Sequence, residues 1–179
     1  MLTKLKKLSS KLIDRNPFWE YKIDEYEYPN GDKGNYYYVN SPGSTMVVPR
    51  LSDGVFVLTK QYRYLNREEC IEFPGGGMRP GASPEENAAA ELLEESGYAA
   101  GSLKYLGRNN PCNGLTNEIC NVYLACDLEL RSPRPDDSEE FEIFTATADE
   151  INDMIRSGII WDGMTLAAWS VYYFSEVKK

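Results

Sequence analysis

Histidine is absent from the 179-residue chain. Without an imidazole base, the chain cannot use the Ser-His or Cys-His pairs of nucleophilic hydrolases. Catalytic proton transfer must therefore fall to carboxylates, lysine or tyrosine. Cysteine is scarce as well. The four copies show no C-x-x-C spacing, which together with the lack of histidine argues against a structural zinc site. We expect free thiols at Cys70, Cys112, Cys120 and Cys126.

Two further shortages limit the partners of the chain. Basic residues are outnumbered by acidic ones, 19 to 28, so the formal net charge is −9. This charge would repel the phosphate backbone of DNA or RNA, and we expect no nucleic-acid partner. A small anionic substrate stays compatible with the charge if its site brings its own cations. No apolar run approaches a signal-peptide core or a membrane span, so we expect a cytoplasmic protein with no membrane partner.

The chain is long enough for one domain with a sizeable core. Residues 1–15 mix lysines with leucines and form a basic N-terminal extension, which we expect to be a surface helix or a frayed end. Residues 16–49 predict antiparallel strands, because aromatic and β-branched runs are separated by turn residues. Residues 50–179 form the main domain. The strand-like runs of the N-terminal part are 21–24, 36–39 and 45–48.

The main domain predicts strands around one central helix, followed by two terminal helices. The central helix spans residues 84–96, where Ser83 is a good N-cap, Glu86 completes a capping box and Gly97 supplies the stop. This order is typical of an α+β or sandwich-like fold rather than a doubly wound sheet. We expect strands near residues 55–58, 70–73, 103–106, 119–125 and 142–146, a glycine-rich loop at 74–81, and helices at 149–157 and 165–177.

Three glutamates share one face of the central helix. Glu91, Glu94 and Glu95 stand at i, i+3 and i+4. Like charges at this spacing destabilise an exposed helix by roughly 0.2–0.5 kcal/mol per pair unless a cation sits among them. Hard cations such as Mg²⁺ prefer carboxylate and phosphate oxygens. Solvated glutamate-rich helices are common, so the cluster alone does not indicate a metal site. The glycine-rich loop before it and the pair Gly97-Tyr98 after it favour that interpretation.

Residues 76–98 resemble the Nudix box, whose pattern is Gly, five residues, Glu, seven residues, then Arg-Glu-aliphatic-x-Glu-Glu-x-Gly-aliphatic. The resemblance implies a Nudix fold, an α/β/α sandwich with a mixed sheet, extended here by the N-terminal antiparallel strands. Two residues depart from the pattern. Ala82 replaces the first Glu, and Ala90 replaces the Arg that in the family pairs with and orients the following Glu, so Glu91 lacks its usual partner. The matching residues are Gly76, Glu91, Leu92, Glu94, Glu95, Gly97 and Tyr98.

The resemblance covers roughly residues 19–174, and its flanks are similar to ADP-ribose pyrophosphatases. It implies hydrolysis of the diphosphate in ADP-ribose or a related nucleoside diphosphate sugar, with Mg²⁺ or alternatively Mn²⁺. The metal ligands that it implies are Glu91, Glu94 (also catalytic), Glu95 and the backbone carbonyl of Gly75. Those relatives are dimers whose N-terminal strands help build the partner's site, which implies a homodimer. The similar flanks are residues 61–63, 71–76, 113–118 and 162–168.

The resemblance also implies roles outside the box. Arg63 would clamp the diphosphate as a bidentate donor. The general base would be Glu139 or Glu140, with Glu139 favoured, next to the polar, proline-containing segment 131–138. Further roles that it implies are aromatic stacking on the nucleobase and support of the substrate. For each of these roles, a place in the core or on the surface is the alternative interpretation of the residues. The candidates are Trp19 and Tyr36 for stacking, and Glu72 and Glu118 for support.

Two alternatives stay open. The first is a Nudix hydrolase of another nucleoside diphosphate derivative such as GDP-mannose, because a fold does not choose its substrate. The second is a Nudix-fold nucleotide-binding protein whose turnover was weakened with Ala82 and Ala90. Retention of all three glutamates after the loop argues against the second alternative, since a mutually repelling cluster without a function is expected to erode.

Overall fold

The computed structural model of the chain describes residues 2–131 and 140–177, which divide into two compact units. The N-terminal unit combines Met1–Gly43 with Asn110–Ile119, and the main unit combines Ser44–Asn109 with Cys120–Lys179. A segment from the middle of the chain therefore completes the N-terminal unit.

The N-terminal unit is an antiparallel sheet of three strands, β1 (Lys6–Arg15), β2 (Glu20–Glu27) and β3 (Lys33–Asn40), in that order. The strands predicted within residues 21–39 are confirmed. The helix or frayed end expected at residues 1–15 is wrong, because β1 pairs along its whole length with β2. Tertiary pairing accounts for the difference, because β2 offers hydrogen-bond partners along β1, and the ion pair of Lys7 Nζ with Asp24, at 2.6 Å, adds to it.

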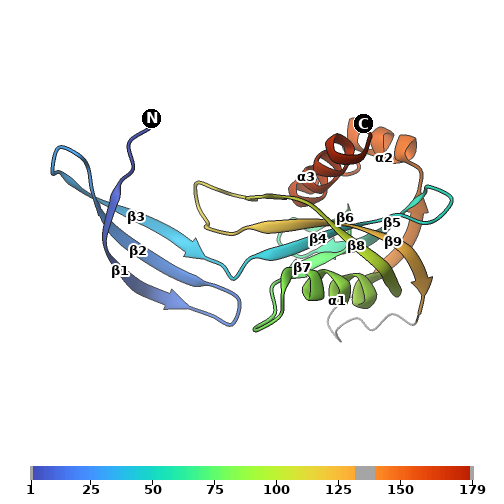
Figure 1. Cartoon of the computed structure of the whole chain (residues 1–179), viewed down its shortest axis with the longest axis horizontal. Coiled ribbons are helices and arrows are strands. Elements are labelled where there is room, and N and C mark those ends of the chain that lie inside the picture. The colour runs from blue at the N-terminus through green and yellow to red at the C-terminus, as the bar shows by residue number, and fades with distance from the viewer. Residues whose placement is uncertain (1, 132–139, 178–179) are drawn as a thin grey trace. The chain divides into compact units, whose positions relative to one another are not determined.

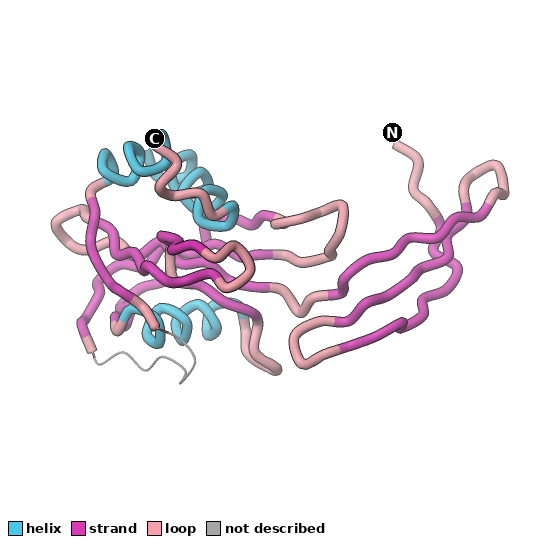
Figure 2. Tube along the Cα trace, turned by 180° about the vertical axis from the view of Figure 1, so that it is seen from behind, coloured by secondary structure: helices cyan, strands magenta, loops and turns pink. Residues whose placement is uncertain are grey.

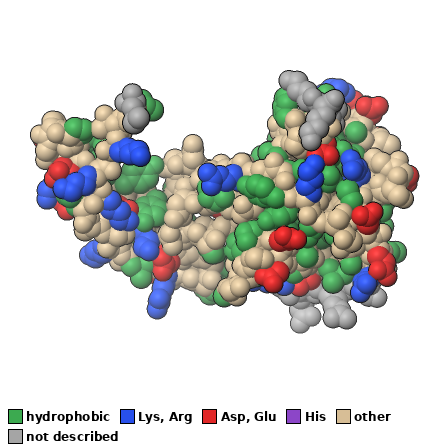
Figure 3. Space-filling view, viewed as in Figure 1, with side chains coloured by type: hydrophobic (Ala, Val, Ile, Leu, Met, Phe, Trp, Pro, Cys, Tyr) green, Lys and Arg blue, Asp and Glu red, His purple; other side chains and the backbone are tan. Residues whose placement is uncertain are grey.

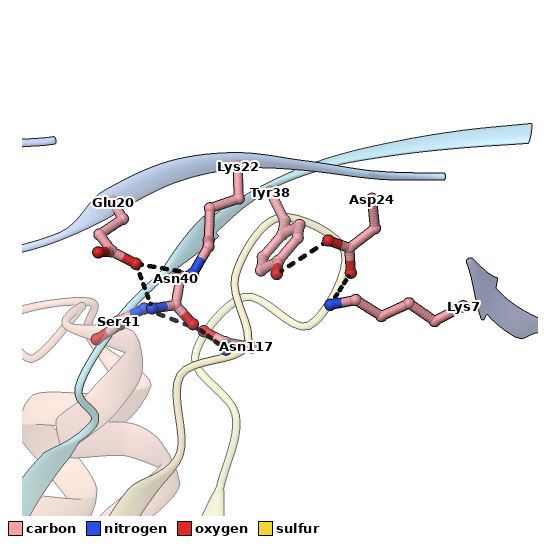
Figure 4. A network of polar contacts seen from close by, with 8 residues as sticks. All are labelled: Lys7, Glu20, Lys22, Asp24, Tyr38, Asn40, Ser41 and Asn117. Atoms are coloured by element: carbon pink, nitrogen blue, oxygen red, sulfur yellow. Dashed lines mark hydrogen bonds and ion pairs between the residues drawn. The ribbon is translucent and has the colours of Figure 1, made fainter. Parts of the chain in front are cut away.

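Asn117, from the inserted segment, connects to the end of β3 (Figure 4). Its Nδ2 donates to Asn40 Oδ1 at 2.7 Å, and its Oδ1 accepts the Ser41 N–H at 3.0 Å. Asn40 in turn donates to Glu20 on β2 at 3.0 Å. This chain of hydrogen bonds joins the inserted segment to two strands. Figure 4 also draws Lys22 beside Glu20, and Lys7 and Tyr38 beside Asp24.

The described strands of the N-terminal unit contain no buried residue. Apolar side chains remain open to solvent, with Leu12 41% exposed, Tyr36 45% and Tyr37 53%. Lysine and arginine side chains gather over this unit in the space-filling view (Figure 3). A sheet of this size lacks a core of its own, and its apolar side chains are available for another surface.

The main unit contains a mixed sheet of four strands. Its two central strands run parallel, and the other neighbouring pairs are antiparallel. The strand order is β7 (Gly75–Gly77), β4 (Ser44–Pro49), β9 (Cys120–Leu130) and β8 (Tyr98–Asn109). The glycine-rich loop predicted at residues 74–81 is thus partly a strand, because Gly75 to Gly77 pair with β4. A second, antiparallel sheet has the order β10 (Glu142–Ala146), β5 (Phe56–Arg63) and β6 (Glu68–Glu72).

Helices cover both faces of the main unit (Figures 1 and 2). Strand β4 explains how, because its side chains alternate between two cores. Met46 and Val48 pack in the cluster that contains Trp169, whereas Val47 packs with Leu92 on the opposite side. This confirms the expected α/β/α sandwich with a mixed sheet. The helices are α1 (Pro84–Ser96) on one face, α2 (Ala148–Arg156) and α3 (Gly163–Tyr172) on the other, and the π-helical turn η1 (Tyr173–Val177) after α3.

The ends of α1 agree with the sequence prediction. Ser83 and Glu86 form the reciprocal capping box, with the Ser83 N–H donating to Glu86 at 2.8 Å. At the other end Gly97 adopts a left-handed conformation with φ of 75°, and its N–H donates to the Leu93 carbonyl. Local side-chain chemistry therefore sets the length of the helix that carries the glutamates.

We predict that Gly97→Ala lowers the free energy of unfolding by about 1 kcal/mol, because a Cβ is strained at this φ. Urea unfolding of the full chain measures the change. Gly163→Ala is the matched control, since Gly163 begins α3 outside the left-handed region and a Cβ there meets open space. The control should keep or gain stability. Equal losses in both variants would contradict this explanation of the helix end.

Candidate functional site

The acidic face of α1 packs directly against β7. Glu95, 7% exposed, accepts a hydrogen bond from the Gly75 N–H at 3.1 Å. A Cβ on Gly76 would collide with the carboxylate of Glu91. At Gly75 a Cβ would meet the backbone carbonyl of Thr45, so glycine is required where β7 lies against β4, whereas at Gly76 the glutamate side chain would have to shift. The structure brings Glu91, Glu95 and Gly75 together, with the N–H of Gly75 directed at the helix.

Arg79 supplies the positive charge at this face. Its Nη2 lies 3.3 Å from Glu91 Oε1 and also contacts Glu94 Oε2. The hydrogen bond to Glu94 is the largest influence and raises the pKa of the Arg79 guanidinium, with the charges of both glutamates adding to it and partial burial opposing it. Sequence reasoning missed Arg79. The available signal was a cationic residue in the glycine-rich segment that precedes the acidic helix.

The backbone of Arg79 is fixed by a buried amide. The Arg79 N–H donates to Asn87 Oδ1 at 3.0 Å, and Asn87 Nδ2 donates to Thr45 Oγ1 at 2.9 Å. Asn87 and Thr45 are both fully buried, so neither amide nor hydroxyl can exchange its partner for water without cost. These bonds connect the loop, α1 and β4.

The acidic face of α1, which lies within the described part of the chain, carries oxygen ligands but no preformed metal cluster. Within residues 2–131 and 140–177, no three or more His, Cys, Asp or Glu side chains are already gathered tightly enough to hold a metal ion. The donors are nevertheless of the right kind, because Glu91, Glu94 and Glu95 offer only oxygen and the first two already share one cationic nitrogen. These residues therefore fit a hard cation such as Mg²⁺ in their chemistry.

Arg63 and Glu72 form a second charged pair in the main unit. Arg63 Nε donates to Glu72 Oε1 at 2.6 Å, and Nη2 contacts the other carboxylate oxygen, so the pair is bidentate. This contact raises the pKa of the Arg63 guanidinium. Glu72 is only 4% exposed, and a buried carboxylate needs such a partner. Glu72 precedes Gly75 by three residues, which keeps their Cα atoms within about 11 Å.

Of the two candidate bases, Glu139 lies outside the described residues. Glu140 is exposed and lines a cavity of about 260 Å³ together with Lys60, Tyr62 and Glu69. Lys60 binds Glu69 at 2.8 Å, and this contact is the main reason that the pKa of Lys60 is raised. Among the described residues that line the cavity, none belongs to α1.

Trp19, Tyr36 and Glu118 belong to the N-terminal unit. The Tyr36 hydroxyl donates to the Gly114 carbonyl at 3.0 Å, and its ring remains 45% exposed. Trp19, 42% exposed, precedes β2, whereas Tyr36 pairs with Asp24 in the middle of that strand. The two rings therefore do not form a stacking pair within this unit. Glu118 is half-buried after the inserted turn.

The four cysteines are free thiols, as predicted. Burial raises the pKa of the Cys70 thiol to about 12, with a further contribution from Glu72, so this thiol stays protonated and inert at neutral pH.

No helix in the described part of the chain has the length and apolarity needed to cross a membrane.

Comparison with known proteins agrees with this architecture. An ADP-ribose pyrophosphatase of Bacillus subtilis is 29% identical over 176 residues, which cover 94% of each chain. A GDP-mannose pyrophosphatase of Pectobacterium atrosepticum is 29% identical over 137 residues, covering 72% of this chain and 71% of that protein. A solved structure described as an ADP compounds hydrolase superposes with a TM-score of 0.82 at 21% identity, covering 97% and 95% of the two chains, and confirms the fold. The family model of the NUDIX domain matches residues 41–159, more than half of the sequence, and the chain belongs to this family.

Proposed function

We propose that the chain hydrolyses the diphosphate linkage of ADP-ribose or a related nucleoside diphosphate sugar, releasing a nucleoside monophosphate and a sugar phosphate. The observation that carries this proposal is the acidic face of α1, where Glu91 and Glu94 converge on one cationic nitrogen and Glu95 is fixed to the loop. Such a face suits a hard cation and, with it, a diphosphate. The B. subtilis relative, an ADP-ribose pyrophosphatase, supports this choice of substrate.

Magnesium is the proposed cofactor, with Mn²⁺ as an alternative. Glu91, Glu94, Glu95 and the carbonyl of Gly75 would hold it. When bound there, the cation would neutralise phosphate charge and act as a Lewis acid. The hydrogen bond from the Gly75 N–H already orients Glu95, so this ligand is placed before the cation arrives.

Arg63 is the proposed diphosphate clamp. Its bidentate pair with buried Glu72 uses one N–H on Nε and one on Nη2, out of five N–H donors on a guanidinium. Glu72 thereby fixes the plane of the guanidinium and leaves the other donors for phosphate oxygens. We assign Glu72 a supporting role for this reason.

We place the general base at Glu139 or Glu140. A water molecule attacks phosphorus, the bond from phosphorus to the bridging oxygen breaks, and the base removes the proton of the water. The absence of histidine leaves carboxylates, lysine or tyrosine as the base, and the family resemblance favours a glutamate. The exposed position of Glu140 beside the cavity of Lys60 supports its candidacy.

The N-terminal unit is proposed to serve dimerisation and nucleobase contact in a cytoplasmic homodimer. Its strands lack buried residues, and Trp19 and Tyr36 present half-exposed rings. Exposed aromatic side chains on a thin sheet favour contact with a ligand or a second copy of the chain. We retain Glu118 as a substrate contact from the same unit.

The function is tested with a panel of substrates that includes ADP-ribose and GDP-mannose, because the P. atrosepticum relative is a GDP-mannose pyrophosphatase. We expect Mg²⁺-dependent release of AMP and ribose 5-phosphate from ADP-ribose, abolished by a chelator. Phosphate and nucleotide products are resolved by chromatography. Hydrolysis of GDP-mannose alone would assign GDP-mannose as the substrate in place of ADP-ribose. No hydrolysis of any compound in the panel would refute the proposed activity.

Glu95→Gln should lower Mg²⁺-dependent hydrolysis by on the order of 100-fold or more, because the amide keeps the size and the acceptor for Gly75 but loses the charge. Circular dichroism should show an unchanged fold. Glu85→Gln is the matched control, an exposed acid in the first turn of the same helix, and should retain activity. Near-normal turnover of Glu95→Gln would remove this residue from the metal site.

The homodimer is tested by light scattering of the full chain. Tyr37→Glu, which places a charge on an exposed ring of β3, should halve the molecular mass and reduce hydrolysis with it. Tyr64→Glu makes the same change at a side chain that is 83% exposed in the main unit, and should leave the mass unchanged. A wild-type chain that is already monomeric would contradict the proposal.

A further inference from the structure

We propose that Arg79 is a built-in counter-cation of α1 and that a divalent cation must displace its guanidinium to reach Glu91 and Glu94. Arg79 would then lower the affinity of the site for metal. The inference rests on the proposed function, in which these two glutamates hold the cation.

The contact uses a single atom. Both Glu91 and Glu94 bind Nη2 of Arg79, so one cationic nitrogen stands between two carboxylates. A metal ion shared by the same two carboxylates would be repelled by this cationic nitrogen, which also covers one oxygen of each carboxylate. The two cations therefore compete for the same two carboxylates.

The position of Arg79 is fixed through its backbone. Its backbone N–H is bound by Asn87, which is fully buried and is held by Thr45. Asn87 and Glu91 stand at i and i+4 on α1, so they lie on the same side of the helix. The anchor thus holds the loop beside the face where the glutamates lie.

No other cation is available from the helix itself. The sequence of α1 contains no lysine or arginine, and Ala90 occupies the place before Glu91. The mutual repulsion of Glu91 and Glu94 must therefore be relieved from outside the helix, and Arg79 provides this relief.

Two possible roles of Arg79 predict opposite changes in metal affinity when its side chain is removed. A counter-cation repels an incoming metal ion and blocks its ligands, so removing it tightens metal binding. A residue that only orients Glu91 would hold the ligand ready, so removing it would weaken metal binding. The partly exposed side chain of Arg79, at 42%, allows replacement without opening the core.

The experiment is titration calorimetry of Mn²⁺ into the full chain, without substrate. We expect Arg79→Gln to bind Mn²⁺ roughly two- to tenfold more tightly than the wild type, the range expected from partly exposed ion pairs. Arg156→Gln removes the same charge from a surface pair with Asp153 on α2 and should bind like the wild type. Arg79→Lys keeps the charge and should fall between the wild type and Arg79→Gln.

Thermal unfolding gives a second readout. Arg79→Gln should have a lower Tm than the wild type in chelator, because the glutamates lose their counter-cation, and the difference should disappear at saturating Mn²⁺. Weaker or unchanged Mn²⁺ binding by Arg79→Gln would overturn the inference while leaving the proposed metal site standing. If neither protein binds Mn²⁺, the metal site fails and the inference fails with it.

Discussion

The attachment of α1 to β4 and β7 is the constraint on which the candidate site depends. Near one end of the helix Asn87 binds Thr45, and near the other Glu95 binds the Gly75 backbone. A buried amide and a buried carboxylate are stable only when such partners are present. Because both contacts point to the same side of the helix, Glu91 between them is pressed against the loop as well. The helix thus has one permitted orientation, and the acids have one permitted location.

Much of this was predictable because it is local. Ser83 and Gly97 fix the ends of α1 through their own side chain and backbone, so the sequence predicted the helix to the residue. The shared face of its glutamates follows from helical periodicity alone. The strand β1 was not predictable in this way. Its lysines and leucines fit an amphipathic helix, and only pairing with another strand, β2, selects the extended state.

The charged pairs of the site were less predictable than the helix α1 and more predictable than the strand β1. Arg63 and Glu72 were each candidates, but their bidentate union depends on how β5 and β6 align. Arg79 was missed because a loop arginine resembles any surface arginine until the loop is seen to turn back on the helix. Its contact with Glu91 also changes the meaning of Ala90. No guanidinium stands at residue 90 of the helix, and the fold places one beside Glu91 from eleven residues earlier in the sequence.

The segment Asn110–Ile119 has a consequence for the order in which the chain can fold. Tyr36 and Gly114, which share a hydrogen bond, are separated by 78 residues. On a ribosome the three N-terminal strands emerge first, yet their last hydrogen bonds wait until the hairpin tip between β8 and β9 has been synthesised. Residues 110–119, which follow β8 in the chain, must therefore be synthesised before the N-terminal unit is complete. The beginning of the chain is therefore made first but cannot form its last hydrogen bonds until about two thirds of the sequence has been synthesised.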